Sequence, residues 1–372
     1  MKAAYLRRSI FRILKKNKWI FYYYEKAKWH KEIEYHKQTN DPKNLKPIDQ
    51  IKREEKLIRK YWRIGTFHYY RYGLQYKQLS DEQILDYVPT YYFHKNIELN
   101  HDGVDTILYG DKLTQALLFE ERNIPTAKVI AVINKGQCMD LSGKSAINLT
   151  KIVQEKLVNS TNKLFFKPSG NCGGAGILVL KCDNSGRLLL NNQSISSLDE
   201  LWSSLIYNDT YVVEENIIQS YQLSQINSSS VNTLRTVVQK VDDKMQLKTC
   251  ILRMGRNGKE VDNSAQGGIS IGVDVSSGQL ADFATAEHGS GVFYEHPDSK
   301  FQFAGSFIDD WKNVKYQIEA IANKLIDFKD IALDIAITND NVILVEFNFR
   351  YGIEHQQCVL GGMRRTFNIS NK

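Results

Sequence analysis

Near its C-terminal end the chain carries a helical pattern followed by two apolar strand patterns, and this succession most constrains its fold. Residues 331–337 and 342–347 are apolar runs joined by the polar turn 338–341, which is typical of a strand pair. The stretch before them has apolar residues at helical intervals: Trp311, Val314, Ile318, Ile321, Ala322 and Leu325. An amphipathic helix next to a strand pair predicts a helix packed on a sheet. The chain is therefore expected to be α+β.

The same mixture of helices and strands is predicted upstream. Helical patterns occupy 112–122 and 147–158. Short apolar runs between turn residues predict the strands 127–133, 164–167, 177–181, 211–214, 233–240, 247–254 and 268–275. We expect two sheet-and-helix lobes behind a mostly helical N-terminal region, 1–75, in which 51–62 forms a charged helix.

Length and cysteine content limit the class of protein. A chain of 372 residues has room for two or three domains of ordinary size. Its five cysteines are odd in number and show no CxxC or CxxH spacing, which argues against a disulfide framework and a zinc site. No uninterrupted apolar stretch reaches about 18 residues, and basic residues interrupt the apolar positions of the N-terminus. We therefore expect a protein of the reducing cytoplasm.

Charge is distributed very unevenly along the chain. Residues 1–78 contain 21 Lys and Arg against 7 Asp and Glu, a net +14, so the whole-chain value of +7 leaves −7 for the remainder. A basic segment of this kind usually has an anionic partner. An amphipathic element lying on an anionic membrane surface is one interpretation, and an ordinary helix with solvated lysines fits equally well. Nucleic acid is not expected, because no base-reading motif accompanies the charge.

Three oxygen-bearing side chains in the final strand pair form a candidate metal site. Glu346 and Asn348 lie two residues apart, so they share one face of their strand. A turn at 338–341 would bring Asp334, which interrupts the other apolar strand, beside them. Two carboxylates and an amide oxygen suit Mg²⁺, which binds a few carboxylates together with phosphate oxygens. The alternative is that Asp334 and Glu346 pair with lysine or arginine, because buried acids need a cationic partner.

A glycine-rich segment follows the predicted strand 164–167. It contains Gly170, Gly173, Gly174 and Gly176, and glycine lets backbone N–H groups approach a phosphate closely. The segment does not match the GxxxxGK[ST] pattern, so a Walker loop is excluded. A plain turn between two strands is the other interpretation.

Two further segments combine a strand with polar residues. The strand 211–214 ends in Glu214 and Glu215, and such an end could offer backbone groups to an adenine and a carboxylate to a ribose. Solvation of two acids at a strand end explains the same pattern. Arg253 precedes the polar, glycine-containing loop 261–268, which suits an anion near the metal; an ordinary hairpin explains it nearly as well.

In this order the segments resemble the ATP-grasp superfamily, from residue 86 to the end of the chain. Residues 109–112 and 123–127 resemble the opening of that fold, where a lysine contacts nucleotide phosphate. Residues 167–169 resemble the second phosphate-binding lysine with its flexible loop, and 214–217 resemble the adenine-binding hinge. The resemblance thus implies these nucleotide-binding residues: Lys112, Lys167, Ser169, Gly173, Gly174, Glu214, Glu215, Asn216 and Ile217. Asp334, Glu346 and Asn348 match the metal-ligand triad of the superfamily.

A narrower resemblance is to the sugar-transfer-associated ATP-grasp family. The motifs that carry it are Tyr87–Pro89, Asn232–Arg235, Arg253–Gly255, Val261–Asn263 with Gly267 and Gly268, and His296–Asp298. The segment 346–350 departs slightly from the Glu-x-Asn-x-x-Gly ending of the superfamily, because the glycine, Gly352, lies one place later. This departure concerns the last loop and not the metal site.

The resemblance implies an ATP-grasp fold of two lobes that clasp nucleotide, behind a basic helical N-terminal extension. It also implies ATP and Mg²⁺ as cofactors. The expected activity is that of a carboxylate–amine ligase that works through an acylphosphate and attaches an amino acid or amine to a sugar acid of a surface polysaccharide. Arg253, Asn263 and Arg235 would line the substrate pocket. A nucleotide-binding scaffold for glycosyltransferases and an ATP-dependent kinase are the alternatives.

Four regions are expected along the chain. They are a basic helical region (1–85), an N-terminal lobe (86–160), a glycine-loop subdomain (161–222) and a metal and substrate lobe (223–372). If the basic region binds lipid, the protein would be attached peripherally to the inner face of the membrane.

Overall fold

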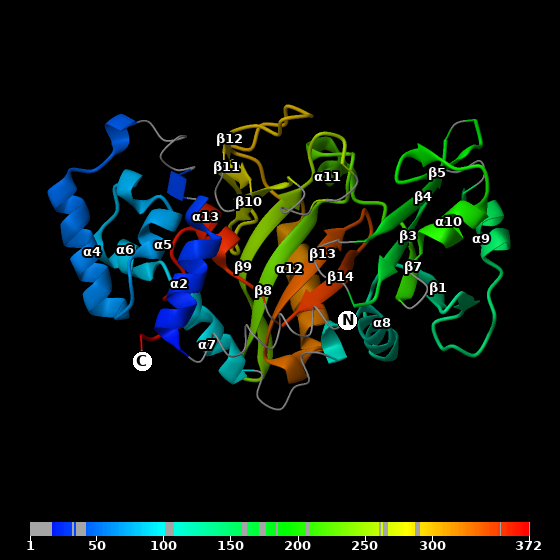
Figure 1. Ribbon diagram of the computed structural model, residues 1–372, viewed down its shortest axis with the longest axis horizontal. Helices are drawn as coiled ribbons and strands as arrows, with labels where there is room; N and C mark the ends of the chain where they lie inside the picture. Colours follow the sequence, from blue (N-terminus) through cyan, green and yellow to red (C-terminus); the bar gives the residue numbers. More distant parts are fainter. Residues whose placement is uncertain are drawn as a thin grey trace.

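Two seven-stranded antiparallel sheets and a helical region make up the structure, a computed structural model (Figure 1). It describes residues 17–31, 33–34, 42–100, 108–157, 162–170, 176–183, 185–205, 209–259, 262, 267–286, 291–349 and 351–371. The second sheet lies between the helical region and the first sheet (Figure 1). The predicted α+β class with two sheet-and-helix lobes is therefore confirmed.

The first sheet has the strand order β2-β1-β7-β3-β4-β5-β6. Its strands are β1 (Val129–Asn134), β2 (Gln137–Met139), β3 (Lys163–Pro168), β4 (Leu178–Cys182), β5 (Leu188–Leu190), β6 (Gln193–Ser194) and β7 (Thr210–Glu215). Two helices, α9 (Leu149–Leu157) and α10 (Leu198–Ser204), pack their apolar sides on it and share its core. Because β3 and β4 pair antiparallel, the glycine-rich segment connects two neighbouring strands.

The second sheet has the strand order β12-β11-β10-β9-β8-β13-β14. Its strands are β8 (Thr233–Val241), β9 (Lys244–Met254), β10 (Ile269–Val273), β11 (Leu280–Ala286), β12 (Val292–Phe293), β13 (Asp330–Ile337) and β14 (Val342–Asn348). One face packs against α12 (Trp311–Asn323), whose buried stripe is the one that the sequence pattern predicts. The predicted hairpin of the last two strands is also present, since β13 pairs with β14.

The other face of the second sheet is covered in part by the helical region. Its helices are α2 (Lys18–Lys28), α4 (Ile48–Trp62), α5 (Phe67–Arg71), α6 (Asp81–Asp86) and α7 (Thr90–Asn100), with the short 3-10 helices η1 (Pro42–Asn44) and η2 (Leu74–Tyr76). Val237 and Ala332 of the sheet belong to the core of this region. The C-terminal segment 351–371, with α13 (Glu354–Leu360), completes that core with these residues: Tyr351, Ile353, Met363, Phe367 and Ile369. The N-terminal helices are thus packed on the last part of the chain.

Short helical elements connect the parts of the chain. η3 (Leu108–Gly110) and α8 (Lys112–Glu121) precede β1, α11 (Tyr221–Ile226) joins β7 of the first sheet to β8 of the second, and η6 (Ile326–Phe328) lies within the second lobe, between α12 and β13. The side chain of Gln115 on α8 donates to the carbonyl of Phe347 (2.9 Å) and accepts from its amide (3.1 Å). β14 is an outer strand of its sheet, so backbone groups along its free edge have no partner strand. The two bonds from Gln115 satisfy the amide and the carbonyl of Phe347 at this edge.

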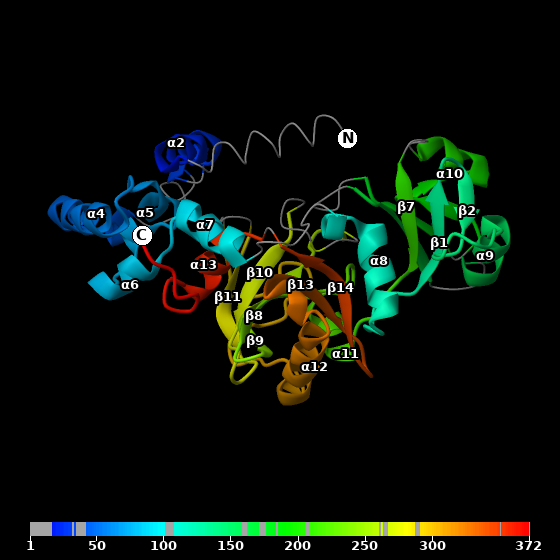
Figure 2. The same ribbon diagram turned by 90° about the horizontal axis from the view of Figure 1, so that it is seen from below.

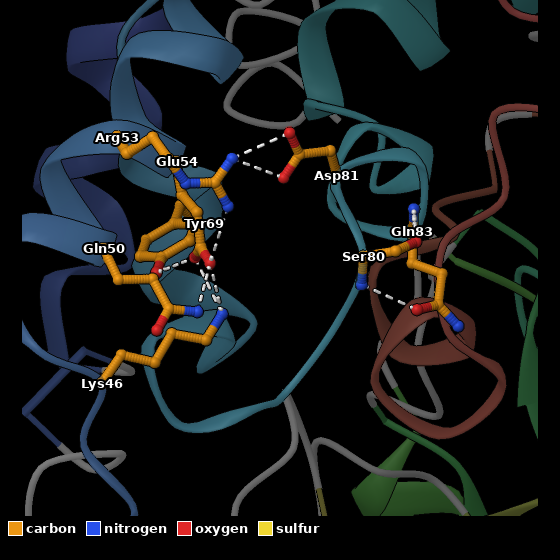
Figure 3. A network of polar contacts seen from close by, with 8 residues as sticks. All are labelled: Lys46, Gln50, Arg53, Glu54, Tyr69, Ser80, Asp81 and Gln83. Carbon is orange, nitrogen blue, oxygen red and sulfur yellow. Dashed lines mark hydrogen bonds and ion pairs between the residues drawn. The ribbon is translucent and has the colours of Figure 1, made fainter.

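A buried network of polar contacts holds the helical region together (Figure 3). Lys46 and Glu54 form an ion pair of 2.8 Å, and both side chains are 0% exposed. The hydroxyl of Tyr69 donates to Glu54 (2.6 Å), as does the amide of Gln50 (2.9 Å). Burial and the Glu54 carboxylate raise the pKa of Tyr69, so this hydroxyl stays protonated and remains a donor.

Most predicted elements are present, with ends that differ by a few residues. The charged helix predicted at 51–62 begins at Ile48, immediately after Pro47, because proline cannot supply an N–H within a helix but is tolerated at its start. The strand predicted at 268–275 ends at Val273, since the next residues form a turn in which Asp274 accepts from the amides of Ser276 and Ser277. The helical pattern of residues 1–16 lies outside the described residues.

Across the described ranges, no helix has both the length and the apolar character that crossing a membrane requires.

Candidate active site

A cavity of about 410 Å³ lies between the two sheets. From the first sheet it is lined by Phe165, Lys167, Ile177, Glu214, Glu215 and the nearby Ala127 and Ile217. From the second sheet it is lined by Val231, Thr233, Arg235, Ile251, Arg253, Asp334, Val345, Glu346 and Asn348. Lys112, Asp262, Gly352, His355 and Gln356 complete its wall. Ten of the predicted site residues therefore line one cavity: Lys112, Lys167, Glu214, Glu215, Ile217, Arg235, Arg253, Asp334, Glu346 and Asn348.

Arg235, Asp334 and Glu346 form a row across three neighbouring strands. Asp334 of β13 is paired in register with Arg235 of β8 on one side and with Glu346 of β14 on the other. Residues paired in this way share a face of the sheet, so all three side chains reach the cavity. Arg235 donates to Asp334 at 2.8 Å. The predicted hairpin thus places Asp334 beside Glu346.

A register shift in β14 exposes two consecutive residues to the cavity. The pairing changes between Asp334 and Ile335, which face Glu346 and Leu344, so Val345 has no partner on β13. Such a bulge re-aims a side chain, and Val345 and Glu346 both line the cavity while Leu344 and Phe347 belong to the core behind the sheet.

Arg253 occupies the next row of the same face. It pairs in register with Thr233, donates to Asp334 (3.2 Å) and forms an ion pair with Asp262 (3.5 Å). The hydroxyl of Thr233 donates to Asp262. Burial would lower the pKa of Arg253, but the carboxylates around it, foremost Asp262, raise it above its usual value. Arg253 is therefore a fixed cation held between two acids.

The acids of the cavity differ in their affinity for protons. Burial would raise the pKa of Asp334, but Arg235 and Arg253 outweigh burial and hold the pKa below its usual range. Burial and the neighbouring Asp334 raise the pKa of Glu346, although Lys112 offsets part of this rise. Burial also raises the pKa of Asp262. Asp334 thus has the arginine partners that one interpretation expects, and it lies beside Glu346 of the neighbouring strand. The metal site stays a prediction.

The residues present fit a magnesium ion in combination with a nucleotide. Among the described residues, no three His, Cys, Asp or Glu side chains are grouped to hold a metal. The cavity offers two adjacent carboxylates and the side chain of Asn348, which donates to Glu346 at 3.2 Å. Mg²⁺ usually takes only one or two protein carboxylates and completes its shell with phosphate oxygens and water. A site of this size therefore suits Mg²⁺ with a phosphate ligand better than a metal held by protein alone.

Two lysines, Lys112 and Lys167, line the same cavity as the acids. Lys167 of β3 forms an ion pair of 2.5 Å with Glu214, and Lys112 is the first residue of α8. Ser169 links their elements, because its hydroxyl donates to Asp111 (2.6 Å) and accepts from the amide of Leu113 (3.0 Å). Ser169 itself does not line the cavity, and its contacts hold the start of α8 against the end of β3.

At the end of β7 and just after it, Glu215 and Ile217 line the cavity, whereas Asn216 between them does not. Glu215 lines the cavity and also pairs with Lys156 at 2.9 Å. Asn216 does not line it, because its side chain accepts from the backbone amide of Lys163 (3.0 Å). The predicted residues Gly173, Gly174 and Asn263 lie outside the described residues.

Sequence reasoning missed four polar residues of the cavity wall: Thr233, Asp262, His355 and Gln356. Thr233 lies two residues before Arg235, so strand alternation could have placed it on the same face. Asp262 lies within the motif Val261–Asn263, but no local pattern predicts its ion pair with Arg253. His355 and Gln356 are on α13, and no local pattern shows that this helix returns to the cavity.

Gln115→Leu is expected to loosen the edge strand that carries Glu346 and Asn348. The substitution leaves the amide and carbonyl of Phe347 buried without their partner, and each such group costs about 1–3 kcal/mol. Hydrogen exchange should show faster exchange of the Phe347 amide. Gln302→Leu serves as the control, because Gln302 is exposed and bonds only to Glu295 and a nearby carbonyl. Exchange at the wild-type rate in Gln115→Leu would contradict the proposed closure of this edge.

One family model matches most of the chain. The sequence model described as "Sugar-transfer associated ATP-grasp" matches residues 94–368. No curated protein matches the chain. Solved structures that are similar to it include phosphoribosylamine–glycine ligase of Thermotoga maritima, with 11% identity, a TM-score of 0.38 and coverage of 66% of this chain and 49% of that one.

Two others are biotin carboxylase of Campylobacter jejuni and N5-carboxyaminoimidazole synthetase of Staphylococcus aureus. The first has 10% identity, a TM-score of 0.39 and coverage of 71% of this chain and 46% of that one. The second, complexed with ADP, has 12% identity, a TM-score of 0.39 and coverage of 71% and 52%. The chain thus spans about half the length of the solved structures that it matches.

Proposed function

The chain belongs to the sugar-transfer associated ATP-grasp family, and on that premise we propose that it is an ATP-dependent carboxylate–amine ligase. The observation that carries the proposal is the composition of the cavity. Two lysines and a pair of adjacent carboxylates line it, and two arginines donate to one of these carboxylates, Asp334. Cations and carboxylates that line one cavity suit phosphoryl transfer, which depends mainly on positioning and on offsetting charge.

We propose ATP and Mg²⁺ as the cofactors. Lys112 and Lys167 would contact the phosphates, and Glu214, Glu215 and Ile217, which line the same cavity, would contact the nucleoside. Asp334, Glu346 and Asn348 would hold Mg²⁺ together with phosphate oxygens. When bound, the ion offsets negative charge on the phosphoryl group that is transferred.

The arginines would act on the substrate acid. In the proposed reaction a carboxylate oxygen attacks the γ-phosphorus, ADP leaves, and an acylphosphate is formed. An amine nitrogen then attacks the acyl carbon, phosphate leaves, and the nitrogen loses a proton to water. Arg253 would hold the carboxylate and then the acylphosphate, because a guanidinium binds such groups in a fork. Arg235 and Asn263 would line the same pocket.

The description of the family as sugar-transfer associated suggests the class of substrate. We propose a sugar acid, free or within a glycan, as the carboxylate, and an amino acid or another amine as the second substrate, in the biosynthesis of a surface polysaccharide. A cytoplasmic enzyme attached to the inner face of the membrane would meet lipid-linked glycan intermediates there. The net charge of +14 in residues 1–78 supports such a location.

Release of free phosphate tests this proposal. The full-length protein is incubated with ATP, Mg²⁺ and pairs of candidate sugar acids and amines, and both phosphate and product are measured. A ligase releases phosphate only when acid and amine are both present. Phosphate retained on the product would identify a kinase, and nucleotide binding without turnover over the whole panel would favour a scaffold.

Lys167→Ala is expected to weaken ATP much more than adenosine. A charge-assisted bond of this kind contributes about 1.5–3 kcal/mol, which corresponds to a loss of roughly 10- to 100-fold in ATP affinity. Isothermal titration with both ligands measures the difference. Lys163→Ala is a matched control, because Lys163 lies four residues earlier on β3 and does not line the cavity. Equal losses for ATP and adenosine would place Lys167 away from the phosphates.

A further inference from the structure

Helix α2 presents its apolar side chains to solvent. Trp19, Ile20 and Tyr23 are 46%, 51% and 63% exposed. They lie within one turn of each other on the side opposite to Phe21 and Glu25, which are buried. Surface helices normally bury their apolar stripe and expose the polar one. In α2, by contrast, three large apolar side chains are exposed although Phe21 is buried, and we call Trp19, Ile20 and Tyr23 the outer stripe.

The other side of α2 is fixed to the protein. Phe21 packs against the rings of Tyr91 and His94, with centroid distances of 6.0 and 6.1 Å. Glu25 forms an ion pair of 3.0 Å with Arg71, and both side chains are nearly fully buried. Figure 2 shows α2 on an outer edge of the helical region. The outer stripe therefore cannot turn inward without breaking this buried pair.

The sequence around the outer stripe is cationic. Residues 1–24 contain seven basic residues and no acid, and the first acid, Glu25, is paired with Arg71. Lys26 and Lys28 follow in the last turn of α2, and Lys26 is exposed. Any partner of this face must accept aromatic side chains and carry negative charge.

We propose that the outer stripe docks α2 on an anionic lipid bilayer. Tryptophan and tyrosine favour the headgroup level, because their rings are apolar with one polar atom. Basic residues without nearby acids are attracted to anionic lipid. Three side chains of one helix are too few for the roughly 1,000 Å² that a stable protein–protein interface needs. This inference deepens the peripheral location given under Proposed function and is independent of the ligase chemistry.

Docking of this kind is reversible. A short stripe enters only the boundary between headgroups and acyl chains, and attraction between charges fades when salt shortens the Debye length. We expect binding at low ionic strength to vesicles with anionic lipid, release at high salt, and no binding to neutral vesicles.

The test is co-sedimentation of the full-length protein with vesicles of phosphatidylcholine that contain roughly one-third phosphatidylglycerol. Trp19→Ser/Ile20→Ser/Tyr23→Ser is the test variant, because it changes only exposed side chains. A deletion of residues 1–40 is less informative, since it also removes the buried Phe21 and Glu25. Tyr221→Ser/Tyr294→Ser/Tyr316→Ser is the matched control, with side chains that are 74%, 66% and 71% exposed.

We expect the test variant to lose at least about tenfold in partitioning to anionic vesicles and the control variant to bind like the wild type. Lys26→Glu should weaken binding at low salt more than at high salt. Absence of wild-type binding at low salt, or equal binding by the test variant, overturns the proposal. The proposal is also overturned if the wild type is a dimer and the test variant is a monomer, because the outer stripe would then bind a second copy of the chain. ATP affinity, measured without vesicles for every variant, reports separately on the proposed ligase site.

Discussion

Glu346→Gln is expected to lower turnover by at least about 10³-fold, a change of several kcal/mol, while the fold stays intact. Glutamine keeps the shape of the side chain but cannot supply the anionic oxygen that Mg²⁺ prefers. The substitution should not destabilise the protein, because burial and Asp334 raise the pKa of Glu346. A carboxyl group with a raised pKa is costly to ionise in the folded state. Above the usual pKa of glutamate, Glu346 therefore lowers the free energy of unfolding, and a neutral glutamine removes this loss of stability.

Two measurements besides turnover check this result. Thermal unfolding should give a midpoint equal to or above that of the wild type, and binding of Mn²⁺ in the presence of ADP should be weakened. Glu120→Gln is the control, because Glu120 is an exposed residue of α8. Wild-type turnover in Glu346→Gln with the correct substrates would remove Glu346 from the proposed metal site, and a loss of fold would contradict the stability argument.

Lys46→Met is expected to destabilise the helical region by about 3–5 kcal/mol, since it leaves the Glu54 carboxylate buried without its cation. Hydrogen exchange of the α4 amides measures the local free energy of opening. Lys46→Met/Glu54→Gln removes both charges and should recover part of the loss. An effect of the double variant equal to or larger than that of the single one would contradict this account.

An exposed ion pair near the same network serves as the control for this prediction (Figure 3). Arg53 and Asp81 form an ion pair of 2.8 Å, as short as that of Lys46 and Glu54, but their side chains are 54% and 48% exposed. Water and salt screen such a pair, so Asp81→Asn should leave the exchange of α4 amides almost unchanged. Equal effects of Asp81→Asn and Lys46→Met on the exchange of α4 amides would contradict the view that burial makes the Lys46–Glu54 pair important for stability.

The sequence was sufficient to predict the strand pair and its acids. Asp334 and Glu346 are polar interruptions of apolar strands, and a short turn between two strands leaves only a few registers. The arginine before a polar loop indicated an anion near the metal for Arg253, and the family resemblance implied that Arg235 lines the same pocket. Both arginines contact Asp334.

Contacts between distant segments could not be predicted in this way. Nothing local to Gln356 shows that α13 folds back to the cavity, because this placement depends on packing against β9, β10 and β11. The same holds for the bond that the side chain of Asn216 accepts from the backbone amide of Lys163, while the place of Asn216 in a nucleotide hinge stays a prediction. The division into regions at 85, 160 and 222 stays a prediction, although β1 and β3, on either side of residue 160, share one sheet.

The packing of the C-terminal segment on the N-terminal helices has a consequence for synthesis of the protein. A nascent chain emerges from the ribosome with its N-terminus first, and domains usually fold as they appear. The core around Trp62 and Tyr69 contains Tyr351, Met363 and Phe367, so its helices emerge early and wait until these three residues, about 300 positions later, have been translated. The segment that closes this core also carries His355 and Gln356 of the cavity wall. Both structures therefore become complete only with translation of the same last segment, and an interrupted chain lacks both.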